Sequence, residues 1–422
     1  MTNRRQKTKT IRSLALLASV LSCAAAWGGE TDTVRTFKDH LSVAASAGYG
    51  YLIPKGDFNK EVVRSHDVGY YDVSVQWRAF EDEANPYDRA LKCPAIQVGL
   101  LYDDYGRIRM QGNESEYVSG LGHEVALYGG MQYDILKRGR WNAGIAFQNG
   151  VALFTRPYNP EKNKDNEMVG SKLTVFVGFS PYVRCQLSPH WALTASCDFK
   201  HVSNGTVDRP NLGANTIGPS VGMVWSVQPQ RTSMYPKWER DAKKYRDQSV
   251  LGPYLEFTAG VGINTLRDHF YMFYTKDNPR YYSFNTMLAA MWRYHQLHAS
   301  GIELDYTHAE YARKTEWYDR ENGYGGYRYS PHVWGLGVRH ELFYRHVSLH
   351  VGVGAYLHRE VGQWAAENEG HTYQSLGLRY SLPFTGDRVF LSYNVKAHNF
   401  SKADCLQFHV GYRLRYSKRG KQ

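Results

Sequence analysis

Residues 191–203 read Trp191-Ala-Leu-Thr-Ala-Ser-Cys-Asp-Phe-Lys-His-Val-Ser203, with apolar residues at the odd positions as far as Phe199. Polar residues stand between them, at Thr194, Ser196, Asp198 and Lys200. Because successive side chains of a β-strand point to opposite faces, this stretch predicts a strand with one apolar and one polar face. Strands of outer-membrane barrels have this pattern, with the apolar face toward lipid and the polar face lining the interior.

The same alternation recurs along the chain in runs of about 10 to 15 residues closed by turn residues, the weak sequence signature of a membrane barrel. The first set comprises Leu41–Pro54, Asp67–Ala79, Ala95–Gly106, Gly122–Lys137, Trp141–Arg156, Lys172–Leu187, Trp191–Ser203 and Asn215–Gln228. The second comprises Pro253–Thr265, Arg280–His295, Leu297–Ala309, Tyr329–Tyr344, Val347–Glu360, His371–Phe384, Arg388–Phe400 and Asp404–Ser417. Eight strands make the smallest common barrel, so each set is sufficient for one.

A charged segment separates the two sets and contains Asp241-Ala-Lys-Lys-Tyr-Arg-Asp247, which no barrel strand resembles. The chain is therefore predicted to be all-β, with two tandem eight-stranded antiparallel outer-membrane β-barrels at 41–228 and 251–417 and a linker at 229–250. One 16-stranded barrel is the alternative. The segment Glu124–Tyr133 corresponds in order to His332–Glu341, which indicates an internal duplication.

Composition excludes several other classes of protein. With 42% hydrophobic and 22% charged residues among 422, the chain is not intrinsically disordered. Its 14% aromatic content, including 33 Tyr, is typical of rings at a membrane–water interface. Beyond the first residues, no run reaches the roughly 18 apolar residues of a transmembrane helix.

The N-terminus reads as a secretory signal over residues 1–26, with a basic start, an apolar run Leu14–Leu21 and the site Ala24-Ala-Ala26. Cys23 offers a rival interpretation as a lipoprotein acceptor. Removal of the signal lowers the net charge from +11 to +6, which is too small and scattered a surplus to indicate nucleic-acid binding. The remaining cysteines and histidines show no metal-ligand spacing, so neither a metal nor a cofactor is expected.

His201 and Ser203 continue the apolar, lipid-facing row of their strand at its loop end. A serine hydroxyl becomes a nucleophile when a positioned imidazole accepts its proton. Asn204 then stands where it would donate to an oxyanion, and Asn215 where it would orient the imidazole. The alternative is that these are polar residues at the point where a strand leaves the membrane.

The stretch Phe199-Lys-His-Val-Ser-Asn-Gly205, followed by Pro210-Asn-Leu-Gly213, resembles the lipid A 3-O-deacylase (PagL-like) family, whose motif is His-x-Ser-Asn, then Pro-Asn-x-Gly, then an acid. The resemblance implies an eight-stranded barrel that cleaves an acyl ester of lipopolysaccharide on its exterior. It implies His201 as base, Ser203 as nucleophile and Asn215 as third member. Oxyanion and substrate contacts are then expected from Asn204, Gly205, Pro210, Asn211 and Gly213.

Asn215 departs from the family, since an amide can orient the imidazole but cannot stabilise imidazolium by charge. An Asn third member also resembles the outer-membrane phospholipase A family, so glycerophospholipid is the second candidate substrate.

In the second half, Ala397 and Asn399 stand where His201 and Ser203 stand in the first, and parity turns His398 into the barrel. The second copy is therefore expected to be degenerate. A non-catalytic barrel with an anchoring or transport role is the alternative for the whole chain.

Overall fold

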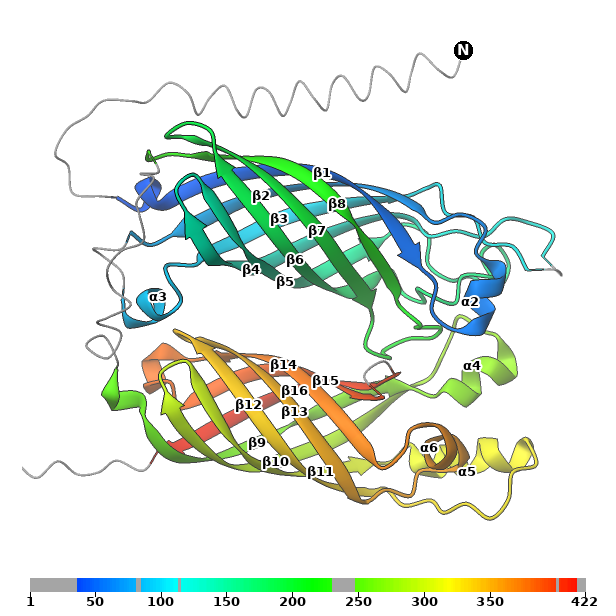
Figure 1. Cartoon of the computed structure of the whole chain (residues 1–422). Coiled ribbons are helices and arrows are strands. Elements are labelled where there is room, and N and C mark those ends of the chain that lie inside the picture. Colours follow the sequence, from blue (N-terminus) through cyan, green and yellow to red (C-terminus); the bar gives the residue numbers. More distant parts are fainter. Residues whose placement is uncertain (1–35, 81–84, 113–114, 230–246, 400–401, 416–422) are drawn as a thin grey trace, which may run out of the picture.

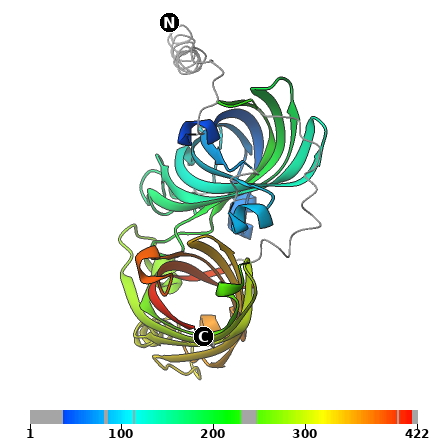
Figure 2. The same ribbon diagram turned by 90° about the vertical axis from the view of Figure 1, so that its left-hand side faces the viewer.

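The computed structural model describes residues 36–80, 85–112, 115–229, 247–399 and 402–415. It contains two closed antiparallel barrels of eight strands each, which confirms the predicted fold over the single 16-stranded alternative. The barrels lie side by side with their axes in a similar direction, and an end-on view shows two separate rings (Figures 1 and 2). The predicted signal and most of the predicted linker lie outside the described residues.

The first barrel consists of β1 (Leu41–Ile53), β2 (Asp67–Arg78), β3 (Ala95–Tyr105), β4 (Gly122–Arg138), β5 (Trp141–Phe154), β6 (Leu173–Gln186), β7 (Trp191–Ser203) and β8 (Ala214–Ser226). The second consists of β9 (Gly252–Thr265), β10 (Arg280–His295), β11 (His298–Ala309), β12 (His332–Tyr344), β13 (Val347–His358), β14 (Thr372–Ser381), β15 (Val389–His398) and β16 (Lys402–Arg415). Short helices occupy the connections: η1 (Phe37–His40), α2 (Asp57–Val62), α3 (Pro86–Ala90), η3 (Gln248–Val250), α4 (Arg267–Phe273), α5 (Ala312–Glu321), α6 (Gln363–Asn368) and η4 (Pro383–Thr385).

Each barrel is closed by pairing of its first and last strands, β1 with β8 and β9 with β16. The strands begin and end within a few residues of the alternating runs in the sequence. Polar–apolar alternation therefore locates the strands, because only one register of each strand turns its apolar residues outward.

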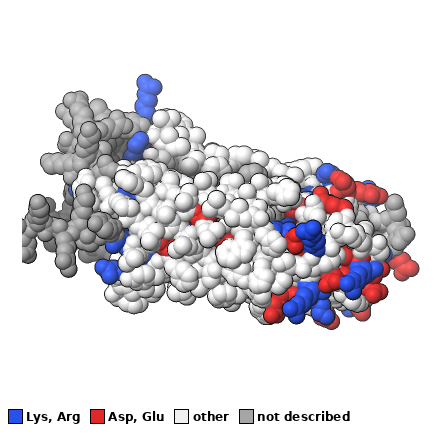
Figure 3. Space-filling view, turned by 90° about the horizontal axis from the view of Figure 1, so that it is seen from below, with Lys and Arg blue, Asp and Glu red and all other residues white. Residues whose placement is uncertain are grey.

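The exterior of both barrels is an apolar belt. Its outward side chains include Val73, Leu100, Leu127, Leu193 and Val221, all strongly exposed. Figure 3 shows few charged atoms along the middle of the face on view, whereas charges gather at the end that carries the long loops. An exposed belt of this kind is the surface that an outer-membrane barrel presents to lipid. Within the described residues, no helix has both the length and the apolar character required to cross a bilayer.

Polar side chains and ion pairs fill the barrel interiors. Lys200 of β7 pairs with Asp103 of β3, and Lys396 of β15 pairs with Asp305 of β11. These are corresponding strands of the two barrels, so the shared pair agrees with an internal duplication. In the second barrel Glu256 also accepts from Arg339 and Arg379, at 2.6 and 2.7 Å.

Short turns join strands at one end of the barrels, and long loops with α2, α4, α5 and α6 lie at the other (Figure 1). The connection between β2 and β3 is long although it lies at the short-turn end. Its helix α3 explains the exception, because Asp88 accepts from Tyr344 and Arg345 of the second barrel, both at 2.6 Å. This connection therefore joins the two barrels.

Candidate active site

His201 and Ser203 lie two residues apart on the outward face of β7, next to the long loops, and both are half-buried. The Ser203 hydroxyl donates to His201 Nε2, with 3.0 Å between the oxygen and the nitrogen. His201 Nδ1–H donates to Asn215 Oδ1 at 2.8 Å. A chain of hydrogen bonds from hydroxyl to imidazole to amide leaves Nε2 as the proton acceptor, which is the arrangement that activates a serine.

The register between β7 and β8 brings His201 and Asn215 together. The two residues are directly opposite each other in the ladder, although the loop 204–213 separates them in sequence. Opposite residues of an antiparallel pair have Cβ atoms about 4.5–5.5 Å apart, which is within reach of a hydrogen bond between side chains. The sheet therefore fixes the pair independently of the loop.

The strand ends at the site are held by a hydrophobic cluster inside the barrel mouth. Val202 and Ala214, the inward neighbours of His201 and Asn215, are each 1% exposed. They pack in a cluster that includes Val62 of α2, Ile108 and Met168. Complete burial of a valine side chain contributes about 1.5–3 kcal/mol, so this packing resists fraying where the site lies.

Gly213 brings the loop close to the imidazole. Its φ is +78°, and a Cβ at this position would lie 2.8 Å from His201 Cε1. Both facts favour glycine, because other residues rarely adopt this conformation and would displace the ring. Gly205, with φ +60°, is likewise held against Leu406 of the second barrel.

Two asparagines close the loop behind Ser203. The backbone N–H of Asn204 donates to Asn211 Oδ1 at 2.9 Å, and the Asn204 side chain donates to Ser171 Oγ at 3.0 Å. Asn211 Nδ2 is buried and has no hydrogen-bond partner among the described residues. An unpaired donor in the loop that follows Ser203 is a candidate for an oxyanion contact.

The loop between β5 and β6 supports the site in a way that the sequence did not reveal. The carbonyl of Glu167 accepts from the Leu212 N–H at 3.1 Å, and that of Met168 accepts from Gly213 at 2.9 Å. Pro210 is buried, and its carbonyl lies so close to Gly170 that a Cβ there would approach it to 2.3 Å. Contacts made through backbone carbonyls leave no residue pattern from which to predict them.

Lys55 is a charged side chain near His201 that no sequence motif indicates. It follows β1 and lies within electrostatic range of His201. Burial lowers the pKa of the Lys55 ammonium, and the positive charge of Lys402 from the second barrel lowers it further. The neighbourhood of the imidazole is therefore cationic.

The second barrel holds the loop 204–213 by several hydrogen bonds. The carbonyl of Thr206 accepts from the N–H and the hydroxyl of Thr265, at 2.8 and 2.9 Å. Thr206 Oγ1 donates to the Asp404 carbonyl at 2.8 Å, and Asn278 Nδ2 donates to the Arg209 carbonyl at 3.0 Å. Since burial also raises the pKa of Asp208 in this loop, the inter-barrel contact is partly shielded from solvent.

The corresponding place in the second barrel contains no Ser–His pair. Ala397 and Asn399 stand there, and β15 ends at His398. Asn399 has φ +51°, so its backbone is not extended as a strand residue would be. His398 is fully buried in the interior.

Comparisons with known proteins find a family model that matches part of each half of the chain. Residues 98–224 match the family model described as lipid A 3-O-deacylase (PagL), and residues 253–416 match that described as acyloxyacyl hydrolase, C-terminal domain. No curated protein matches the sequence.

Solved structures resemble the chain only distantly. The outer membrane enzyme PagL shares 15% identity over 43% of this chain and 97% of its own, with a TM-score of 0.28. Neisserial surface protein A shares 10% sequence identity over 44% of this chain and 97% of its own, also with a TM-score of 0.28. A mutant Rh. blastica porin shares 8% sequence identity over 89% of this chain and 99% of its own, with a TM-score of 0.16.

The first match covers the first barrel from β3 into β8 and includes the motif residues from His201 to Asn215, and the second match covers the second barrel. The first barrel is therefore similar to lipid A 3-O-deacylase (PagL) over residues 98–224, and the second barrel is similar to the acyloxyacyl hydrolase C-terminal domain over residues 253–416.

Proposed function

We propose that the protein is an outer-membrane hydrolase that removes an ester-linked acyl chain from lipid A, with Ser203 as nucleophile. The observation that carries this proposal is the hydrogen-bonded series Ser203, His201 and Asn215 on the outward, apolar side of a barrel. The match of residues 98–224 to the lipid A 3-O-deacylase (PagL) model supports the same reaction. Export by the predicted signal at residues 1–26 would bring the protein to that membrane.

The reaction begins when Ser203 Oγ attacks the ester carbonyl of an acyl chain beside the barrel. His201 Nε2 accepts the hydroxyl proton as the new C–O bond forms. Collapse of the tetrahedral intermediate breaks the ester bond, and His201 returns the proton to the departing sugar oxygen. Water, deprotonated by the same nitrogen, then hydrolyses the acyl-serine and releases the fatty acid.

Asn215 holds the imidazole in the tautomer that this sequence of steps requires. Its neutral amide provides no negative charge to stabilise imidazolium, and the nearby Lys55 opposes that charge. We assign the oxyanion contact to Asn211 Nδ2, a buried donor without a partner among the described residues, because Asn211 Oδ1 accepts a hydrogen bond from the N–H of Asn204, the residue after Ser203. Preorganised donors of this kind contribute about 2.7–4 kcal/mol to lowering a barrier.

Glycerophospholipid is the alternative substrate, because it also presents acyl esters at a membrane interface. The family match to residues 98–224 favours lipid A. Lys55 and Lys402 near the site also suit a substrate with anionic groups.

A supporting, non-catalytic role for the second barrel follows from its contacts. Its residues Thr265, Asn278 and Asp404 form hydrogen bonds with the loop 204–213. It has Ala397 and Asn399 where the first barrel has His201 and Ser203. The site is thus built on one barrel and held by the other.

Mass spectrometry of lipid A from cells with and without the protein tests the proposal. Wild type should remove the mass of one acyl chain, and Ser203→Ala should leave lipid A intact. Ser300→Ala is a matched control, because Ser300 also bonds a histidine, His340, on an outward face at 2.9 Å. Unchanged lipid A with wild type, or deacylation by Ser203→Ala, would refute the proposal.

A further inference from the structure

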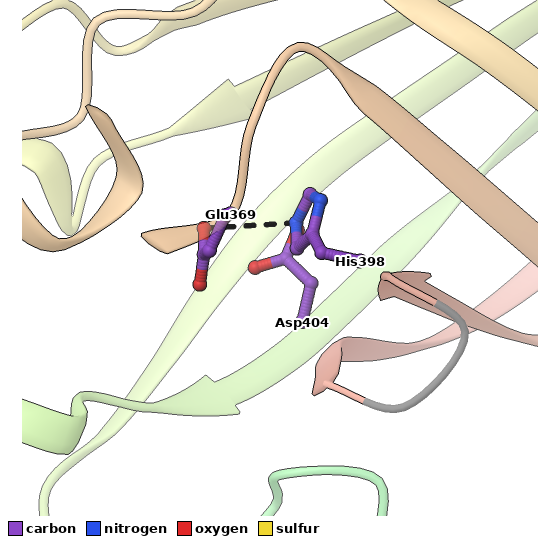
Figure 4. A group of neighbouring side chains, drawn as sticks. All are labelled: Glu369, His398 and Asp404. Carbon is purple, nitrogen blue, oxygen red and sulfur yellow. Dashed lines mark ion pairs between the residues drawn. The ribbon is translucent and has the colours of Figure 1, made fainter. Parts of the chain in front are cut away.

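A second group of reactive side chains lies at the loop end of the second barrel, away from Ser203. Glu369 follows α6, His398 ends β15 and Asp404 lies in β16, and their side chains point toward one another (Figure 4). Their ligand atoms all lie within 4.8 Å of one another. Among the described residues, no other group of three such side chains meets in this way.

The orientation of His398 is the decisive observation. The residue is fully buried, and its Nδ1–H donates to the Thr372 carbonyl with 3.2 Å between the atoms. Nε2 is directed toward two carboxylates, with which a protonated ring forms ion pairs and to which an unprotonated ring adds a third metal-binding atom. A backbone carbonyl on the other ring nitrogen is the contact that commonly orients a metal-binding histidine.

The distances do not fit a closed set of hydrogen bonds. Nε2 lies 3.6 Å from Glu369 Oε2 and 3.7 Å from Asp404 Oδ2, beyond the range of about 2.7–3.2 Å for N–H···O bonds. Nε2 has no hydrogen-bond partner among the described residues. Two ligands at about 2.0–2.2 Å from a tetrahedral ion lie ~3.4 Å apart, close to the observed separations.

Arginine side chains and a small cavity lie beside the two carboxylates. Arg359 donates to Glu369, and a ligating carboxylate is typically held by such an outer contact. A cavity of about 60 Å³ lies beside Glu369 and Asp404 and extends to Arg209 of the loop 204–213, called the catalytic loop below. This space is sufficient for a water molecule as a further ligand.

We propose that Glu369, His398 and Asp404 bind one divalent transition-metal ion, Zn²⁺ or Mn²⁺, as a structural site of the second barrel. The imidazole nitrogen favours these ions over Ca²⁺ and Mg²⁺, which prefer oxygen ligands alone. The ion joins the end of β15, the start of β16 and the segment after α6. Because the Asp404 carbonyl also accepts from Thr206, the site lies directly behind the contact with the catalytic loop.

The test uses the full chain in detergent, stripped with a chelator and then titrated with ZnCl₂ or MnCl₂. Bound metal is counted by elemental analysis, and the midpoint of heat-induced barrel unfolding is measured with and without metal. Wild type should bind one equivalent, and the midpoint should rise. His398→Ala and Asp404→Asn should both lose the ion and the rise, while heat-modifiable migration shows that each still folds.

His340→Ala is the matched control, because His340 and His298 form an outward histidine pair with 3.3 Å between ring nitrogens. It should bind metal as wild type does. The proposal is overturned if wild type binds no metal, if His398→Ala and Asp404→Asn bind as wild type does, or if only His340→Ala loses the ion. These measurements do not depend on hydrolysis, so a failure of the metal site and a failure of the proposed function can be told apart.

Discussion

Among the individual residues, His201 and Ser203 are expected to act as one catalytic unit. His201→Ala and Ser203→Ala should each reduce acyl release by at least about 10²- to 10⁴-fold, because each removes the proton transfer that activates the hydroxyl. The double variant should be no slower than either single variant, since members of a catalytic unit are not additive. Initial rates on lipid A in mixed micelles provide the measurement, and additive losses would contradict the unit.

Replacement of Asn215 by glutamate is expected to raise the rate of acyl release, whereas replacement of His201 or Ser203 lowers it. Asn215→Glu should increase the rate, because a carboxylate stabilises imidazolium where the amide only orients it. The increase in rate should be at most about 10²- to 10⁴-fold, and any strain from the longer side chain would reduce it. If Asn215→Glu and Asn215→Ala both left the rate unchanged, Asn215 would not be the third member.

Gly213 tests the close approach of the loop to the imidazole. Gly213→Ala should reduce the rate strongly, because its Cβ would lie 2.8 Å from His201 Cε1. Gly139→Ala is the control, since Gly139 also has positive φ, at +58°, but open space around its Cβ position. Both variants should lose about 1–2 kcal/mol of stability from backbone strain, and only the first should lose activity. Equal activities would show that the loop has room to move.

At the scale of the element, the catalytic loop is expected to depend on the second barrel. Asn278→Ala removes the hydrogen bond to the Arg209 carbonyl and should lower kcat by roughly two- to tenfold, the equivalent of one hydrogen bond. Tyr393→Phe is the control, because it removes a bond to Asn149 that joins the barrels away from this loop. Comparable losses in both variants would indicate a general effect of barrel contact instead of loop positioning.

The sequence allowed prediction of the strands but not of the loop contacts. Alternation from Trp191 to Ser203 identifies a strand and its outward face, because burial of one face requires it. His201 and Ser203 follow from the same parity. The support from Glu167 and Met168 was not predictable, because it is provided by backbone carbonyls. The contact of α3 with the second barrel was also missed, since no local pattern specifies a partner so distant in sequence.

For the molecule as a whole, we propose that a duplicated barrel has diverged into a half that carries the reaction and a half that supports it. Restoring the two side chains should not restore the reaction: in a Ser203→Ala background, Ala397→His with Asn399→Ser should remain inactive. The reason is geometric, because β15 ends at His398 and Asn399 has a left-handed backbone. Deacylation by this full-length variant would contradict the assignment. Residues 252–422 expressed alone should likewise fold as a barrel and hydrolyse neither lipid A nor phospholipid.

Removal of an acyl chain from lipid A by Ser203 of the first barrel is the reaction that we propose. The most direct measurement is fatty-acid release by the purified full-length protein from lipid A and from phospholipid in separate micelles, analysed by mass spectrometry. Wild type is predicted to release fatty acid from lipid A and little from phospholipid, and folded Ser203→Ala to release none from either. Release from phospholipid alone, or from lipid A by Ser203→Ala, would contradict the account.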